Sequence, residues 1–554
     1  MHLYAWTYTN VSSPEPKAVA ATVVSPQSQQ QGVVPASSAA VTPHISPESA
    51  PEHTPEHAPE QTPSVPRQSR GGTTTAAPGV AVSAGATRGP RLWWRSARVQ
   101  SWGLAGIFFV LYASLAVRRF QTMRATGFDL GIFEQAIRAY AHGQAPIALL
   151  KGPGFNLLGD HFHPLLMIFA PFYRLFPTPI TLLVGQALLS AVAIVPLVRW
   201  AHRARGPKVS LWAGLGLGAS WGIATLNGFD FHEVCLAVPL LAFALAAAGQ
   251  QRWKAAAAWG LPLLLVKEDL GLTLALLGGC IVWKGPKRLG WALVAAGLLG
   301  TALEMLVILP SMNPHGSFDY WNEIASGSTV ASAHANTPLQ TALHTFWPLQ
   351  KYLTVLMLLA PTAFLALRSP FVLLLLPTLG WRFVSANPQY WGTLFHYNAT
   401  LMVIVFAAAV DALDRDRAVL RGRRLRWLLA GSAAFTVAAL PFYPLPGVLS
   451  PSAWQTSPHV RTAAGVLARI PDGATVASSN ELAAQLTSRT EVSLICSDNP
   501  PPVAPDWVVM DRTDITDWPC ARPSMADLVD ADRNSGEYRL VFQADGITLL
   551  HRNG

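Results

Sequence analysis

Apolar runs separated by short polar segments recur along most of the chain, from about residue 103 to residue 443. A helix needs about 20 apolar residues to cross the hydrocarbon core of a bilayer, although shorter helices can be packed inside a bundle. The pattern predicts about eleven crossings: 103–117, 180–198, 211–226, 234–248, two arms of a hairpin within 255–283, 289–309, 352–367, 371–384, 397–413 and 427–443.

Clusters of basic residues between the runs predict how these helices are oriented. Arginines at 88–98 precede the first run, and the segments RWAHRARGPK and DRDRAVLRGRRLR follow later ones. Because Lys and Arg stay on the cytoplasmic side, the N-terminus is predicted inside and the C-terminus outside. The segment HPLLMIFAPFYRLF is too short to span. We therefore expect a re-entrant or interfacial helix within a long first outer loop, residues 118–179.

The run 255–283 is interrupted by Lys267, Glu268 and Asp269. A single helix of this length would place the three charges mid-membrane, at about 2.5–3.5 kcal/mol each. Basic residues flank both ends of the run. This arrangement predicts a hairpin whose Lys-Glu-Asp turn lies at or just inside the outer face.

The two ends of the chain differ from this membrane part, residues 89–445. Residues 1–88 are rich in Pro, Ser, Ala and Gln and poor in large apolar side chains, which predicts a disordered cytoplasmic tail. Residues 446–554 alternate helix-like and strand-like segments, with strands expected at ATVAS, EVSLI, DWVVMD, YRLVFQ and GITLLHR, which predicts a small extracytoplasmic α/β domain. Within it, Asn480 is expected to be the N-cap of a helix. Cys496 and Cys520 could form a disulfide there or remain free thiols.

Composition supports the membrane assignment. Of 554 residues, 51% are hydrophobic and 13% charged, and the mean hydropathy is +0.30. Soluble domains carry about 25% charged residues. The chain is therefore predicted to be a mainly α, polytopic bundle in the cell membrane with an α/β C-terminal domain. Its net charge of +9 lies in clusters beside apolar runs, so it indicates orientation and no nucleic-acid partner is expected.

Polar blocks gather at the predicted outer ends of the helices: FDLGIFEQ, GDHFHP, FDFHE, KED, SFDYW and FHYN. Ionisable side chains at membrane depth usually line a functional cavity. Phosphate-binding loops, dinucleotide-binding glycine patterns, zinc-protease motifs and serine nucleophile elbows are absent from the sequence. The blocks therefore predict one shared cavity at the outer face.

Each block also has a structural interpretation. Asp129 could simply cap the following helix, in which Glu134 would pair with Arg138. Asp160 could cap the re-entrant helix, and the Lys-Glu-Asp turn could be an internally paired turn. His396 and Tyr397 suit an ordinary aromatic-rich helix start, and the loop cations could be solvated charges.

Five segments, over roughly residues 128–413, resemble the signature blocks of an uncharacterised bacterial membrane family, domain of unknown function 2079. They are FDLGIFEQAIRAYAHG, LGDHFHPLLMIFAPFYRLFP, FDFHE, LLLVKEDLGL and FHYN. That family is similar, more distantly, to GT-C glycosyltransferases, membrane enzymes that use polyprenyl-phosphate sugars. These enzymes place an acidic residue in the first outer loop, where this chain has Asp129. They often carry a paired acidic motif, but Leu130 follows here, and HFHP stands where one mannosyltransferase subgroup has a Lys-Pro-Pro-like element.

The resemblance implies transfer of a sugar from a polyprenyl-phosphate donor to an extracytoplasmic acceptor. Asp129 is the candidate general base and Glu134 the second candidate. Candidate metal or phosphate-side groups, for a divalent ion of unknown identity, are Asp160, His161, His163, His232 and Glu233. Candidate substrate or phosphate contacts are Arg124, Arg138, Lys151, Lys267, Glu268, Asp269, His396 and Tyr397.

Two other functions stay open at this point. A transporter or lipid flippase would use the charged turn and the histidines as an ion relay, but it should show inverted repeats and polar groups near the midplane. No repeat is evident, and the charges gather at one face. A non-catalytic assembly or binding protein of the cell envelope would instead use the outer α/β domain for recognition.

Overall fold

The computed structural model describes residues 95–322, 337–496, 500–501, 503–514, 517–520 and 523–553. All of these belong to one compact unit, residues 86–554. The predicted tail, residues 1–88, lies outside the described residues, as does part of the outer loop between 309 and 349.

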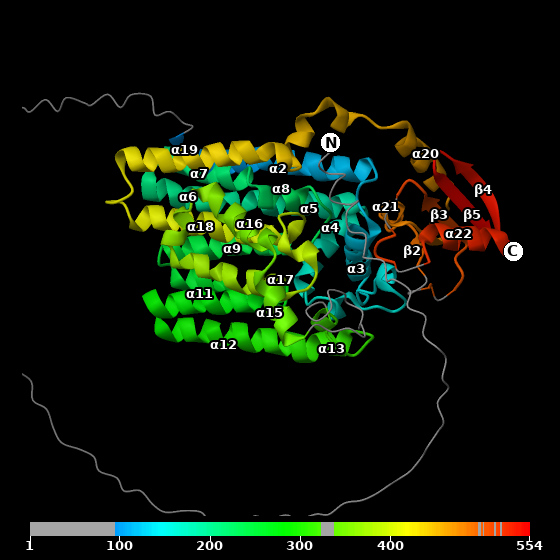
Figure 1. Ribbon diagram of the computed structural model, residues 1–554, viewed down its shortest axis with the longest axis horizontal. Coiled ribbons are helices and arrows are strands. Elements are labelled where there is room, and N and C mark those ends of the chain that lie inside the picture. The colour runs from blue at the N-terminus through cyan, green and yellow to red at the C-terminus, as the bar shows by residue number, and fades with distance from the viewer. Residues whose placement is uncertain are drawn as a thin grey trace, which may run out of the picture. The chain divides into compact units, whose positions relative to one another are not determined.

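The membrane part is a bundle of helices that run along one common direction (Figure 1). Its helices are α2 (Ala97–Gln121), α5 (Pro179–Val192), α6 (Ile194–Arg205), α7 (Pro207–Gly218), α8 (Trp221–Asn227), α9 (Val234–Gly249), α10 (Trp253–Gly260), α11 (Leu270–Lys284), α12 (Lys287–Leu303), α13 (Leu309–Met312), α16 (Leu349–Leu359), α17 (Leu376–Val384), α18 (Ala399–Arg415) and α19 (Gly422–Ala439). Each run predicted to cross has a helical counterpart here.

Fewer helices than predicted meet the requirement for crossing by length and composition. Among the described residues, five segments do so: Ala97–Gln121, Pro179–Arg205, Lys287–Met312, Pro388–Arg415 and Gly422–Phe442. The bent pair α7 and α8, with an angle of 44°, makes a sixth if it is one span. The other apolar helices are shorter, at 10–17 residues. The chain is thus a mainly helical membrane protein with five or six candidate spans, and eleven crossings stay a prediction.

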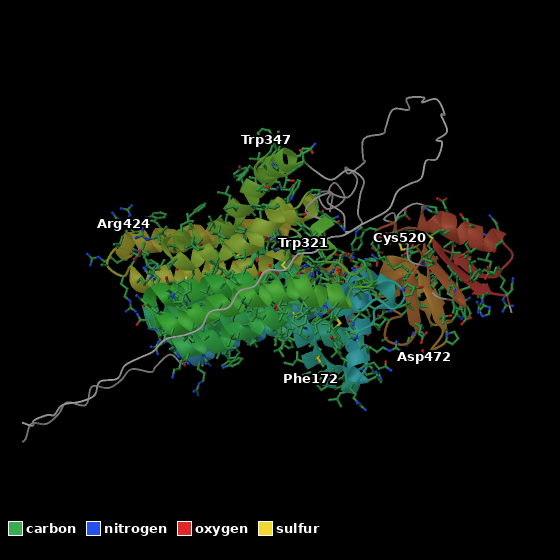
Figure 2. The ribbon with its side chains drawn as sticks, turned by 90° about the horizontal axis from the view of Figure 1, so that it is seen from below. Phe172, Trp321, Trp347, Arg424, Asp472 and Cys520 are labelled. Carbon is green, nitrogen blue, oxygen red and sulfur yellow. A yellow bond between two sulfur atoms is a disulfide. The ribbon has the colours of Figure 1, made fainter. Side chains whose placement is uncertain are left out.

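Two helices show opposite environments. In α18, every residue from Ala399 to Leu413 is buried, because helices such as α6 and α9 surround it. In α19, only Ser432 is buried, and large apolar side chains such as Trp427 and Val437 are exposed. Arg424, near the start of α19, lies at the end of the bundle away from Cys520 of the C-terminal domain (Figure 2). The basic segment before α19 and the C-terminal domain therefore lie at opposite ends of the bundle.

The charged hairpin has the predicted form. A 3-10 turn, Leu261–Leu265, follows α10, and Lys267, Glu268 and Asp269 make the bend into α11. Close packing holds α11 against α12, since a Cβ at Gly297 would lie 2.3 Å from the carbonyl oxygen of Gly271. Small residues let helix backbones approach in this way. The turn is therefore held firmly inside the bundle.

The first outer loop contains a wide π-type turn, Gly127–Gly131, followed by α3 (Ile132–Ala141). The short segment expected to be interfacial is a 3-10 turn, Pro164–Phe169, continued by α4 (Ala170–Leu175). It exposes several large apolar side chains, among them Phe172 (Figure 2). An exposed apolar edge of this kind suits an interfacial helix.

The C-terminal domain is built on a five-stranded sheet of order β2-β1-β3-β5-β4. Its strands are β1 (Thr475–Ser478), β2 (Glu491–Leu494), β3 (Trp507–Asp511), β4 (Tyr538–Ala544) and β5 (Ile547–Arg552), with helices α20 (Pro458–Leu467), α21 (Asn480–Ala483) and α22 (Met525–Asn534). Strands β2, β1 and β3 are parallel, and β5 pairs antiparallel with β3 and β4. All five predicted strands are present. The prediction for Asn480 was wrong: Ser479 occupies the N-cap position, and Asn480 is the first helical residue.

A disulfide joins Cys496, after β2, to Cys520. We expect Cys496→Ser with Cys520→Ser to reduce the stability of the C-terminal domain by about 3 kcal/mol, because the closed loop restricts the unfolded chain. Thermal unfolding of the full chain, with and without reductant, measures this. Reductant should destabilise the wild type and leave the double variant unchanged. An equal response of both proteins would contradict the prediction.

Candidate functional site

Asp129 lies in the π-type turn Gly127–Gly131, at the end of the bundle that faces the C-terminal domain. It does not cap α3, whose N-terminus has no side-chain cap. Its carboxylate faces the segment between α8 and α9, where Oδ1 lies 3.2 Å from Nε2 of His232. The structural interpretation of Asp129 as a cap was therefore wrong, and the outer-loop acid joins a second polar block.

His232 begins a chain of alternating charge. Its Nδ1 lies 3.4 Å from Oε2 of Glu233, and Oε1 of Glu233 accepts a hydrogen bond from Nζ of Lys267 at 2.8 Å. Glu233 is fully buried and Lys267 nearly so. Asp129, His232, Glu233 and Lys267 are called the charged chain below. Buried charges persist only when paired, and this sequence of contacts pairs each of them.

The block GDHFHP meets the Lys-Glu-Asp turn. Nδ1 of His161 lies 2.8 Å from Oε1 of Glu268, whose other oxygen accepts from the Phe162 amide at 3.3 Å. Asp160 does not cap the helix after it, since it pairs with Lys151 at 3.0 Å. Two predicted polar blocks thus make direct contact.

The histidine rings form a third set of contacts. His396 stacks on His232 with ring centroids 3.4 Å apart, and Phe133 places its ring edge against both His232 and His163. A small cavity of about 20 Å³, space for about one water molecule, lies beside His396. Among the residues that line it are Lys267, Asp269, Trp381, His396 and Tyr397. Four of these were predicted from the sequence as substrate contacts.

Three predicted residues are not part of this cluster. Glu134 accepts hydrogen bonds from Tyr173 and from Thr487 of the C-terminal domain. Arg138 does not pair with Glu134 as expected, because its guanidinium donates to the carbonyl oxygens of Thr487 and Thr490. Arg124 is exposed. Glu134 and Arg138 thus belong to the contact between the two domains.

The residues predicted as metal ligands are directed at different partners. Asp160 contacts Lys151, His161 contacts Glu268, and His163 lies against Phe133. In the parts of the chain that the structure describes, His, Cys, Asp and Glu form no group of three or more that could hold a metal ion. The structure therefore does not bring these residues together as the metal ligands expected from the sequence. The divalent ion stays a prediction, and no step below is derived through it.

Exposure distinguishes the acids of the site. The side chain of Asp129 is 19% exposed, whereas that of Glu233 is fully buried and that of Glu268 is 6% exposed. Burial disfavours the charged form of His232, but Asp129 and Glu233 outweigh it and raise the pKa of His232 to about 9. His232 is therefore cationic at neutral pH, beside the one acid of the charged chain that solvent reaches.

Two contributors were not singled out from the sequence. Asp230 is buried, and its Oδ2 accepts from the amide and hydroxyl of Thr126 at 2.9 and 2.7 Å. Gln186, inside α5, donates to the Asp230 carbonyl and accepts from the His232 amide. Asp230 stands within FDFHE and could have been identified as a third polar residue there. A lone Gln in an apolar helix gives a much weaker signal.

The helical bundle and its candidate spans define a polytopic membrane protein with a cluster of charged side chains at one end of the bundle. The chain belongs to the family described as "Predicted membrane protein (DUF2079)", which matches residues 119–549. That match covers both the bundle and the C-terminal domain. No curated protein matches the chain in sequence.

Two solved structures are similar to this chain. Apo ArnT from Cupriavidus metallidurans is similar with a TM-score of 0.50 and 15% identity, covering 82% of this chain and 98% of ArnT. The archaeal oligosaccharyltransferase AglB from Archaeoglobus fulgidus, solved with an inhibitory peptide and a dolichol-phosphate, gives a TM-score of 0.40 and 12% identity, covering 83% of this chain and 75% of AglB. At these identities the likeness to ArnT shows the fold alone.

Removing one member of the charged chain should be strongly destabilising. Glu233→Gln leaves Lys267 buried without its anionic partner, for which we expect a loss of about 3–5 kcal/mol. Thermal unfolding of the purified protein measures it. The double variant Glu233→Gln with Lys267→Met should recover part of the loss, since no charge is then left unpaired. A single variant as stable as the wild type would show that the pair does not form.

Glu134 should make the stability pH-dependent. Burial raises the pKa of Glu134 from 4.5 to about 7, although Thr487 and Tyr173 hydrogen bonds favour its charged form. The folded chain therefore holds this proton more tightly than the unfolded chain. The contribution of Glu134 to stability is largest below pH 4.5 and falls by about 3 kcal/mol as pH rises to about 7. Unfolding of wild type and Glu134→Gln across this window tests it, since the variant should lack this component. Parallel profiles would contradict it.

Proposed function

We propose that this protein is a GT-C-type glycosyltransferase that moves a sugar from a polyprenyl-phosphate donor to an acceptor outside the cytoplasm. The observation that carries the proposal is the contact of Asp129 with the charged chain at the outer end of an ArnT-like fold. A carboxylate in the first outer loop that solvent reaches can accept a proton from a bound hydroxyl, and the adjacent His232 holds it in place.

In the proposed reaction, the acceptor hydroxyl oxygen attacks the anomeric carbon of the donor sugar. The bond from that carbon to the phosphate oxygen breaks, and its electron pair leaves with the polyprenyl phosphate. Asp129 takes the hydroxyl proton. Glu233 is fully buried and Glu268 nearly so, which leaves Asp129 as the best-placed base. Glu134 is assigned no catalytic role, because it lies at the domain contact.

Charge develops on the departing phosphate and requires cationic partners. His232 is cationic and adjoins Asp129, and Lys267 lines the nearby cavity. Lys151 contributes a further cation, with its Nζ over the rings of Phe128 and Phe155. Both lysines already face carboxylates, so a phosphate would have to share them with Glu233 and Asp160.

The transporter alternative is less well supported by this geometry. The charged side chains lie in turns at one end of the bundle and pair with one another. An ion relay through the membrane needs polar groups nearer the midplane. A non-catalytic binding role does not require the solvent-accessible acid beside a cationic imidazole.

We expect Asp129→Asn to lower turnover by about 10²–10⁴-fold, because the amide cannot accept the acceptor proton. The assay incubates purified full-length protein with a panel of radiolabelled polyprenyl-phosphate sugars and follows release of polyprenyl phosphate. Asp472→Asn is the matched control, since Asp472 is an exposed acid on the C-terminal domain.

Three outcomes would overturn parts of the proposal. Unchanged turnover in folded Asp129→Asn removes Asp129 as the base, and loss of turnover in Glu134→Gln alone would transfer that role. Uptake of lipid or solute by reconstituted vesicles, with no released polyprenyl phosphate for any donor, would favour the transporter.

A further inference from the structure

The C-terminal domain contacts the membrane domain directly beside Asp129. Oδ1 of Asn480, the first residue of α21, accepts a hydrogen bond from the Phe128 amide at 2.7 Å. The first N–H groups of a helical segment have no partner within it. In the turn that begins at Gly127, one of these groups is satisfied by a side chain 352 residues away.

Glycines at both ends of the turn allow this contact. A Cβ at Gly127 would lie 2.6 Å from the Cβ of Ala483 in α21. A Cβ at Gly131 would lie 2.7 Å from Leu150 Cδ1 and 3.1 Å from Thr487 Cγ2. A side chain at Gly127 would therefore clash with α21, and one at Gly131 would displace the end of the Leu150 side chain and press against Thr487. The spacing of the glycines in GFDLG thus reflects the fit between the two domains.

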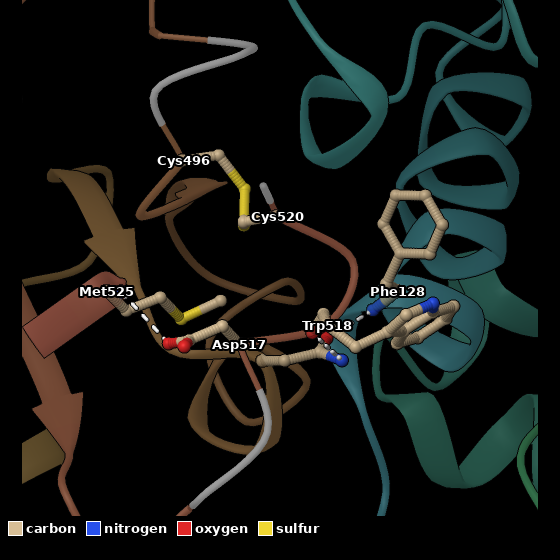
Figure 3. Close-up of a disulfide and its surroundings, with 7 residues drawn as sticks. Phe128, Cys496, Asp517, Trp518, Cys520 and Met525 are labelled. Atoms are coloured by element: carbon tan, nitrogen blue, oxygen red, sulfur yellow. Dashed lines mark hydrogen bonds between the residues drawn. A yellow bond between two sulfur atoms is a disulfide. The ribbon is translucent and has the colours of Figure 1, made fainter. Parts of the chain in front are cut away.

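A second contact comes from Trp518 of the C-terminal domain (Figure 3). Its ring meets the Phe128 ring edge-on, with centroids 5.1 Å apart, and its carbonyl oxygen accepts from Nδ2 of Asn480 at 3.4 Å. The Cys496–Cys520 disulfide fixes one side of Trp518. On its other side, Oδ1 of Asp517 accepts from the Met525 amide at 3.0 Å. The surface that receives Phe128 is therefore itself anchored.

The membrane domain holds the turn from the opposite side. Asp230 accepts both hydrogen bonds from Thr126, the residue before the turn, and Asp230 stands two positions before His232. One end of the turn is thus tied to the segment that carries His232, and its Phe128 amide is tied to the C-terminal domain. Asp129 follows directly after these two attachments.

We propose that Asn480 is a positioning residue: its hydrogen bond to the Phe128 amide fixes the turn that aims Asp129 at His232, so that the C-terminal domain completes the active site. The inference rests on the proposed function, because it concerns the same acid. A misplacement of about 1 Å in a catalytic group can reduce turnover about 10²-fold. A hydrogen bond to the backbone of the neighbouring residue acts directly on that placement.

Hydrogen exchange of the full-length protein tests the contact without any substrate. In Asn480→Ala we expect the Phe128 amide to exchange about tenfold faster, because one hydrogen bond is lost. Asn480→Asp keeps the acceptor oxygen and should retain the protection. Gln485→Ala is the matched control: it removes another contact between the domains, Nε2 of Gln485 to the Phe120 carbonyl at 2.9 Å, and should leave Phe128 protected.

Turnover with polyprenyl-phosphate sugars tests the consequence. Asn480→Ala should lower kcat about 10–100-fold with little change in KM, while Gln485→Ala should behave like the wild type. Asn480→Asp should restore kcat, and its added negative charge should move the acidic limb of the pH–rate profile upward.

The hydrogen-exchange experiment and the turnover experiment together distinguish failure of this inference from failure of the proposed function. Unchanged Phe128 exchange in Asn480→Ala would overturn the inference whatever the activity. Lost protection with unchanged kcat would overturn the positioning role, even though the contact exists. If Asn480→Ala loses the protection of the Phe128 amide but the wild type releases no polyprenyl phosphate from any donor, the catalytic part of the inference fails together with the proposed function.

Discussion

The pairing of buried charge at the end of the bundle next to the C-terminal domain is the constraint on which the candidate site depends. Lys267 and Glu233 are both removed from water, and either one alone would be strongly unfavourable. Their contact fixes the Lys-Glu-Asp turn to the segment after α8, and His232 continues it to Asp129. The close packing of α11 against α12 supports this arrangement, because it holds the turn where its charges meet their partners.

Asp129 differs from the other acids of the site because hydrogen bonds fix the turn that carries it while its side chain stays partly exposed. Its turn is attached on one side through Thr126 to Asp230 and on the other through the Phe128 amide to Asn480. The carboxylate itself keeps partial exposure, with His232 on one side. Rigid support for an accessible group is what a reacting side chain requires, since placement accounts for much of the rate.

The sequence predicted the class of fold and all five strands, because hydrophobic periodicity is a local property of the chain. It also predicted that the polar blocks meet, because the order of the helices places these blocks at the same end of the bundle. It could not separate α18 from α19: both are apolar, and only packing decides that one is enclosed and the other faces outward. It also misplaced Glu134 and Arg138, which share a helix with the predicted site. Their partners, such as Thr487, lie some 350 positions later in the chain, and no local sequence pattern indicates that contact.

Hydrogen bonds between residues 128–138 and residues 480–492 join the two domains into one unit. The Phe128 amide, the Gln135 side chain and the Arg138 guanidinium all donate to acceptors in residues 480–492. Without the C-terminal domain these donors would lose their partners, and the turn carrying Asp129 would lose one attachment. A family that matches residues 119–549, across both domains, is consistent with a site that neither part completes alone. The C-terminal domain thus directly supports the turn that carries Asp129, through Asn480.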